Sequence, residues 1–197
     1  FLIEDNAQAP GAKINEVLTG TIGDAAIFSF NRHKVMQCGE GGLVICKDNH
    51  IAMKMRLIRN HGEALVDEFG INNLVNIVGL NYRMPNMEAV IAKIQFSKLE
   101  SFNNYRIEMA NYFSKLLSEV DGIIAPKVLE GYKHTYYLYV MKFEKEIIGI
   151  DRELFAKAVE AEGFILKAGY TRPLYMTPIY QKMIGFGRSG FPFTANS

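Results

Sequence analysis

The stretch FSFNRHKVMQCGEGG, residues 28–42, decides how this sequence is interpreted. It overlaps an apolar segment, AAIFSF at residues 25–30, that is typical of a buried strand. A single lysine, Lys34, follows that strand, and three glycines come soon after it. Glycines let a backbone approach a ligand closely, and strand ends in an α/β sheet face the crevice where ligands bind. Lys34 is therefore the first candidate functional residue.

Asp5 ends a second apolar run, FLIED at residues 1–5, and Gln8 follows it closely. Ser29 offers a hydroxyl near Lys34. A lysine at a strand end, with a carboxylate available for a ring nitrogen, is what pyridoxal phosphate chemistry requires. Each residue also has an ordinary explanation, because most lysines are exposed and aspartates often cap the next element. Taken together, they favour a cofactor site.

Composition and charge exclude several classes of function. Of the 197 residues, 49% are hydrophobic and 22% are charged, which is ordinary for a soluble globular protein. The net charge of +1 gives no electrostatic footprint for nucleic acid. No apolar run is long enough for a membrane helix, and the histidines lack metal-ligand spacing. We therefore expect a cytoplasmic protein with no nucleic-acid partner, no membrane partner and no metal.

Periodicity and turn residues predict an α/β arrangement in the first part of the chain. The expected elements are strands at 1–5, 25–30 and 42–47, a hairpin at 14–20, and helices at 48–62 and 86–120. The segment at 63–85 is too long for an ordinary connection, which indicates a functional loop.

A smaller α+β unit is expected to follow, so the predicted domains are residues 1–120 and 121–197. Its expected elements are a strand at 134–143, a helix at 151–163, a strand at 164–170 and a loop at 172–183. The aromatic run Tyr136, Tyr137 and Tyr139 is most simply explained by packing within a strand.

Four blocks in this order resemble the DegT/DnrJ/EryC1/StrS family of sugar aminotransferases: IEDNAQAPGA (3–12), GDAAIFSFNRHKVMQCGEGG (23–42), MRLIRNHG (55–62) and GLNYRMPNMEAVI (79–91). The resemblance runs to about residue 99 and continues more loosely at 172–183. It implies part of the large domain of a fold-type I pyridoxal-phosphate enzyme, followed by the smaller α+β domain, which is incomplete here. The family's phosphate loop and stacked aromatic residue precede such a segment, so we expect this sequence to be a piece of a longer protein.

The resemblance also implies roles for single residues. Lys34 matches the lysine that forms a Schiff base with pyridoxal 5′-phosphate, and Asp5 matches the acid that pairs with its ring nitrogen. Gln8 matches a position beside the ring, and Ser29 matches a hydroxyl that holds the phosphate. Asn81 is similar to an asparagine that reaches the phosphate from the neighbouring subunit, which implies a homodimer with a shared active site.

Arg83, in the same block as Asn81, is a candidate for an anionic part of the substrate. The implied reaction moves an amino group from glutamate or glutamine to a keto sugar, typically one linked to a nucleotide. Some relatives carry histidine instead of the lysine and act as dehydratases; here His33 precedes an intact Lys34, which favours transamination. A sugar dehydratase, and a regulator that senses cofactor or sugar without catalysis, remain the alternatives.

Overall fold

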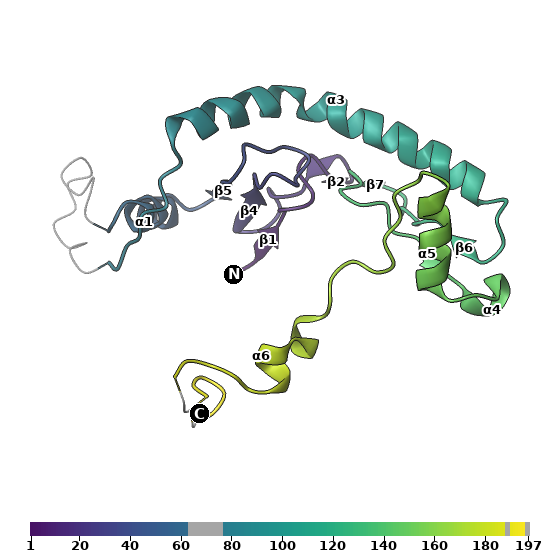
Figure 1. The fold of residues 1–197 in the computed structure, drawn as a ribbon. Helices are drawn as coiled ribbons and strands as arrows, with labels where there is room; N and C mark the ends of the chain where they lie inside the picture. The colour runs from purple at the N-terminus through teal and green to yellow at the C-terminus, as the bar shows by residue number, and fades with distance from the viewer. Residues whose placement is uncertain (63–76, 188–189, 196–197) are drawn as a thin grey trace. The chain divides into compact units, whose positions relative to one another are not determined.

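The computed structural model describes residues 1–62, 77–187 and 190–195 (Figure 1). The chain divides into two compact units, Phe1–Lys142 and Phe143–Ser197. The division of the whole protein into domains near residue 120 stays a prediction. Most of the functional loop expected at 63–85 lies outside the described residues.

A three-stranded sheet in the first unit confirms the three strands expected there. Its order is β1 (Ile3–Asp5), β4 (Ala25–Ser29) and β5 (Gly42–Cys46). β1 runs parallel to β4 with Asp5 opposite Ile27, and β5 runs antiparallel to β4. Because β1 and β4 are parallel, their carboxyl ends lie at the same edge of the sheet. This edge, called here the carboxyl edge, carries Asp5 and Ser29.

The hairpin expected at 14–20 is also confirmed. β2 (Lys13–Ile14) pairs antiparallel with β3 (Val17–Leu18). The two turn residues between them, Asn15 and Glu16, have φ values of 48° and 65°. Positive φ at both positions is the geometry of a type I′ turn, which matches the twist of the strands that it joins. On its other side β2 pairs with β7 (Tyr132–Lys133).

Two helices of the first unit match the expected ones closely. α1 spans Asn49–Arg59. Its N-cap is Asp48, whose carboxylate accepts the backbone N–H of Ile51 at 2.9 Å, and this bond lowers the pKa of Asp48. α3 spans Asn86–Leu117 and is one continuous helix (Figure 1).

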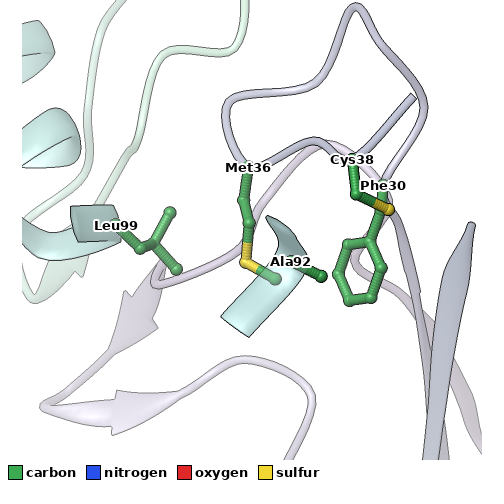
Figure 2. Packing of buried hydrophobic residues seen from close by; sticks show 5 residues of the cluster. All are labelled: Phe30, Met36, Cys38, Ala92 and Leu99. Atoms are coloured by element: carbon green, nitrogen blue, oxygen red, sulfur yellow. The ribbon is translucent and has the colours of Figure 1, made fainter. Parts of the chain in front are cut away.

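The core of the first unit lies between α3 and the loop that follows β4. The buried cluster comprises Phe30, Met36 and Cys38 from that loop and Ala92 and Leu99 from α3 (Figure 2). Ala92 and Leu99 are seven residues apart, so they lie on one face of the helix. Burying this face fixes the loop that carries Lys34 onto the helix, chiefly through the hydrophobic effect.

The part of the chain after α3 confirms one expected helix. The described elements after α3 are β6 (Ile123–Ile124), β7, β8 (Lys142–Phe143), α4 (Lys145–Ile148), α5 (Arg152–Ala161), a 3₁₀ turn (Leu174–Met176) and α6 (Pro178–Gln181). α5 confirms the helix expected at 151–163, and Asp151 stands at its N-cap.

The strand expected at 134–143 is wrong, except for its last two residues. Tyr136 has φ of 49°, which interrupts any extended run. The strand expected at 164–170 is wrong as well: no regular element spans these residues, and the side chain of Ile165 is 80% exposed. A strand is stabilised by neighbours that pair with it and cover its side chains. Among the described residues, no helix is both long and apolar enough to cross a membrane.

Candidate active site

Asp5 occupies the end of β1 at the carboxyl edge. Its side chain is exposed, and Oδ1 accepts the backbone N–H of Ala7 at 3.0 Å. This bond within the following turn orients the carboxylate. The preceding residue, Glu4, anchors the strand: its carboxylate accepts the N–H groups of Gly20 at 2.7 Å, Ile22 at 2.8 Å and Gly23 at 2.6 Å.

These bonds to Glu4 join β1 to the segment that leads into β4. Those from Gly23 and Gly20 contribute most to lowering the pKa of Glu4, because backbone N–H groups stabilise the carboxylate form. Glu4 therefore helps to fix β1, and with it Asp5, beside β4. Sequence reasoning missed Glu4, although an acid inside an apolar strand was a signal for a role.

The loop that carries Lys34 leaves the carboxyl edge at Ser29 and returns to it at Gly42. Ser29 is half-buried, and its hydroxyl oxygen accepts the N–H of Asn31 at 3.3 Å. The loop is closed by backbone bonds from Phe30 N–H to the Gly41 carbonyl at 2.9 Å and from Lys34 N–H to the Asn31 carbonyl at 2.8 Å. The lysine is therefore held on a short, internally bonded loop.

Asn31 is a second residue whose role the sequence did not reveal. Its Nδ2 donates to Glu40 Oε1 at 2.7 Å across the loop, and its Oδ1 accepts the N–H of His33 at 3.1 Å. Asn31 thus joins the two sides of the loop on either side of Lys34. An asparagine directly after a strand is a common turn residue, so no signal distinguished it from any other.

The amino group of Lys34 lies over an aromatic ring. Its Nζ is 4.9 Å from the centroid of the Tyr137 ring, within the range of a cation–π interaction. Lys34 is half-buried. Tyr137 belongs to the run that was expected to pack within a strand; here its ring instead contacts the lysine that the sequence singled out.

The backbone before Tyr137 is held in an uncommon conformation. Tyr136 is buried at φ of 49°, a region that costs about 1–3 kcal/mol for a residue other than glycine. Arg106 of α3 donates to the Tyr136 carbonyl from Nε at 3.0 Å and from Nη2 at 2.7 Å, and to the Tyr137 carbonyl from Nη2 at 2.9 Å. His134 Nδ1 accepts the N–H of Tyr136 at 2.9 Å.

Gln8 lies in the turn that follows Asp5 and is exposed. That turn is fixed from α3 by Asn103, whose side chain is 1% exposed and whose Nδ2 donates to the Pro10 carbonyl at 2.9 Å. Gly11, with φ of 81°, allows this approach: a Cβ there would lie 2.6 Å from Asn103 Nδ2. The turn that carries Gln8 is thus seated on the same helix as the Lys34 loop.

Asn81 and Arg83 lie elsewhere in the first unit, against the end of α1. Arg83 Nη1 donates to Asn60 Oδ1 at 2.6 Å, and Asn81 forms a backbone bridge with Asn60. Asn81 Oδ1 accepts the N–H of Arg83 at 3.5 Å. Within the described ranges, no hydrogen bond joins either residue to Asp5, Ser29 or Lys34. The structure thus brings Asp5, Ser29 and the Lys34 loop to one edge and leaves Asn81 and Arg83 outside that group.

Comparison with known proteins gives a family for this arrangement. The family model described as "DegT/DnrJ/EryC1/StrS aminotransferase family" matches residues 1–196. The chain belongs to this family. Aminotransferases of the family depend on pyridoxal phosphate, and the fold class expected from the sequence is confirmed by structural neighbours of fold type I.

Among curated relatives, the spore coat polysaccharide biosynthesis protein SpsC of Bacillus subtilis is 28% identical over 202 residues, covering 100% of this chain and 52% of SpsC. A dTDP-4-dehydro-2,3,6-trideoxy-D-glucose 4-aminotransferase of Saccharopolyspora spinosa is 30% identical over 190 residues, covering 92% of this chain and 48% of that protein. The crystal structure of DesV from S. venezuelae matches with a TM-score of 0.78 and 27% identity, over 91% of this chain and 46% of DesV. The chain spans about half the length of the curated relatives that it matches.

Proposed function

We propose that this chain contributes the lysine-bearing part of the active site of a pyridoxal-phosphate-dependent aminotransferase. The observation that supports this most is the position of Lys34, on a bonded loop at the carboxyl edge, beside the parallel strand that ends at Asp5. Ligands of open α/β sheets bind at this edge.

The side chains at this edge fit the chemistry of the cofactor. The Lys34 amine suits the aldehyde of the cofactor, and the Asp5 carboxylate suits its protonated pyridine nitrogen. The Ser29 hydroxyl suits its phosphate. Gly39, in the same loop as Lys34, has open space at the position of a Cβ, since a Cβ there would have no heavy atom within 4 Å. When bound, the cofactor supplies an electron sink that stabilises a carbanion at the carbon losing its proton.

The residues of this chain would do the rest of the work. Lys34 Nζ would hold the cofactor by condensing with its aldehyde, with loss of water, and once displaced by the amino donor it would take a proton from the donor's Cα and return it as a general acid. The Asp5 carboxylate would pair with the ring nitrogen of the cofactor. The Ser29 hydroxyl would donate a hydrogen bond to a phosphate oxygen, and Gln8 would border the ring.

The proposed substrates are an amino-acid donor, glutamate or glutamine, and a keto sugar linked to a nucleotide. The names of the relatives support this class, since they include aminotransferases of dTDP-linked, GDP-linked and UDP-linked sugars. We further propose a homodimer in which Asn81 serves the phosphate of the partner's site. The exposed side chain of Asn81 is compatible with that role. Arg83 is a candidate contact for an anionic group of the substrate.

The test is a transamination assay with the full-length protein, pyridoxal phosphate, glutamate or glutamine, and a panel of nucleotide-linked keto sugars. We expect an amino sugar to form with at least one acceptor, and Lys34→Ala to abolish its formation. Product without nitrogen, formed by loss of water, would show a dehydratase instead. Cofactor binding with no reaction on any acceptor or donor would favour a sensing protein.

A further inference from the structure

The contacts around Tyr137 form a chain of interactions that starts on α3 and ends at the reactive amine. Tyr137 was expected to pack within a strand, yet its ring lies 4.9 Å from Lys34 Nζ. The neighbouring Tyr136 adopts a φ of 49°, which no strand would require. Such a backbone persists only where the surroundings hold it.

Two residues, Arg106 and His134, do hold it. The guanidinium of Arg106 donates to two successive carbonyls, those of Tyr136 and Tyr137, at 2.7–3.0 Å. A planar guanidinium suits this forked geometry, which a lysine ammonium cannot reproduce. From the other side, His134 Nδ1 accepts the Tyr136 N–H at 2.9 Å, and its ring packs on the Tyr136 ring at a centroid distance of 4.3 Å.

We propose that Arg106 and His134 are positioning residues that hold the Tyr137 ring as the resting place of the Lys34 amine when it is not bound to the cofactor. The proposal rests on the proposed function, because it matters only if Lys34 is the reacting lysine. A long, flexible side chain has many rotamers in water. An aromatic face that attracts an ammonium reduces them and keeps Nζ at the carboxyl edge.

The chemistry of each group supports its part. His134 must have an unprotonated Nδ1 to accept the Tyr136 N–H. Burial of its ring against Tyr136 lowers the pKa of His134, which favours that neutral form at physiological pH.

The test observes Lys34 directly, in the full-length protein without cofactor. Protons above the face of an aromatic ring resonate upfield, so the Hε signals of ¹³C-labelled Lys34 report the Tyr137 ring. Lys34→Ala identifies the signal by removing it. In the unchanged protein we expect the Lys34 Hε signal to lie upfield of the other lysine signals. Adding pyridoxal phosphate should move it, because Nζ then leaves the ring.

The variants separate positioning from folding. Tyr137→Leu, Arg106→Met and His134→Phe should each return the Lys34 signal to the range of the other lysines. Tyr137→Phe keeps a ring, and His134→Asn keeps an acceptor, so both should retain the upfield position. Arg152→Met, which removes an exposed arginine of the second unit, is the matched control and should leave the signal unchanged.

Several results would overturn the proposal. An upfield signal that persists in a folded Arg106→Met protein would show that Arg106 does not position Tyr137. Loss of the upfield shift in His134→Asn as well as in His134→Phe would show that the hydrogen-bond acceptor at residue 134 does not position Tyr137. A Lys34 signal that is not upfield in the unchanged protein would refute the proposal that the amine rests on the Tyr137 ring. So would a signal that stays upfield after borohydride has trapped the cofactor on Lys34. Because no amino transfer is measured, failure of the proposed reaction would leave these signals as they are.

Discussion

Replacing Glu4 by glutamine tests how the site is anchored. In Glu4→Gln, the single carbonyl oxygen can still accept the N–H groups of Ile22 and Gly23, but the amide nitrogen faces the N–H of Gly20. One hydrogen bond to a charged group is lost, and such bonds contribute about 1.5–3 kcal/mol. The two retained bonds also weaken because their acceptor is no longer charged.

Since Glu4 is half-buried, water can replace part of what is lost. We therefore expect Glu4→Gln to lower the free energy of unfolding by about 2–3 kcal/mol at pH 7. The matched control is Glu16→Gln, because Glu16 is exposed and its carboxylate pairs with Lys13 at the surface. Ion pairs of that kind contribute little to stability, so the control should stay close to the unchanged protein.

The pH dependence gives a second check with a defined sign. The pKa of Glu4 is lowered in the folded protein from the ordinary value of 4.5. The stability that Glu4 contributes is therefore complete above about pH 4.5 and is lost as the pH falls through the folded pKa. Urea unfolding at successive pH values should show the gap between the unchanged protein and Glu4→Gln narrowing in acid. A gap that stays constant down to pH 3, or one no larger than that of Glu16→Gln, would refute the reasoning.

Three further perturbations test separate parts of the structure. Burial lowers the pKa of His134 below 6.5, so the unfolded chain binds a proton first as the pH falls. The free energy of unfolding should therefore decline below about pH 6.5, and it should decline less in His134→Asn. Equal pH profiles of the two proteins would contradict this. Leu57→Ala, at a side chain with 0% exposure, should cost about 2–5 kcal/mol in urea unfolding, and Ile58→Ala, 38% exposed, clearly less. Gly11→Ala should cost about 1–3 kcal/mol, because it strains a φ of 81° and crowds Asn103; an unchanged unfolding midpoint would argue against this close approach.

Local signals were sufficient for the elements that build the carboxyl edge. The apolar runs at 1–5, 25–30 and 42–47 became β1, β4 and β5, and α1 falls within the helix expected at 48–62. In these segments the apolar runs and the turn residues agree on the elements, although the burial does not follow, since Ile3 of β1 and Leu43 and Val44 of β5 are exposed. Agreement between levels of this kind is what makes a segment predictable.

The segment at 134–143 shows where such signals fail. Alternating aromatic residues are typical of a strand, but long-range bonds decide the conformation here. Arg106, some 30 residues earlier, occupies the carbonyls of Tyr136 and Tyr137 that a neighbouring strand would otherwise bind. No local pattern in the sequence contains that interaction, so the contact between Tyr137 and Lys34 was not predictable.

The sequence predicted several single residues of the candidate site better than it predicted the contacts that hold them in place. The sequence identified Lys34, Asp5 and Ser29, and the parallel pairing of β1 and β4 brings their segments to one edge. It did not identify Glu4 or Arg106, whose partners are backbone groups that any residue type carries. It also missed Asn31, whose bond to Glu40 spans the loop. The roles of Gln8, Asn81 and Arg83 stay predictions, since they depend on a bound cofactor, a substrate or a second subunit.

The most direct test of the central claim is to find where pyridoxal phosphate becomes attached. The full-length protein is incubated with the cofactor, reduced with borohydride and digested. The peptides are then examined by mass spectrometry for the added pyridoxyl group. We predict that the group is found on Lys34 and that Lys34→Arg abolishes the specific attachment while the protein remains folded. Attachment at another lysine, or equal attachment in Lys34→Arg, would contradict the assignment of Lys34 as the cofactor-binding residue.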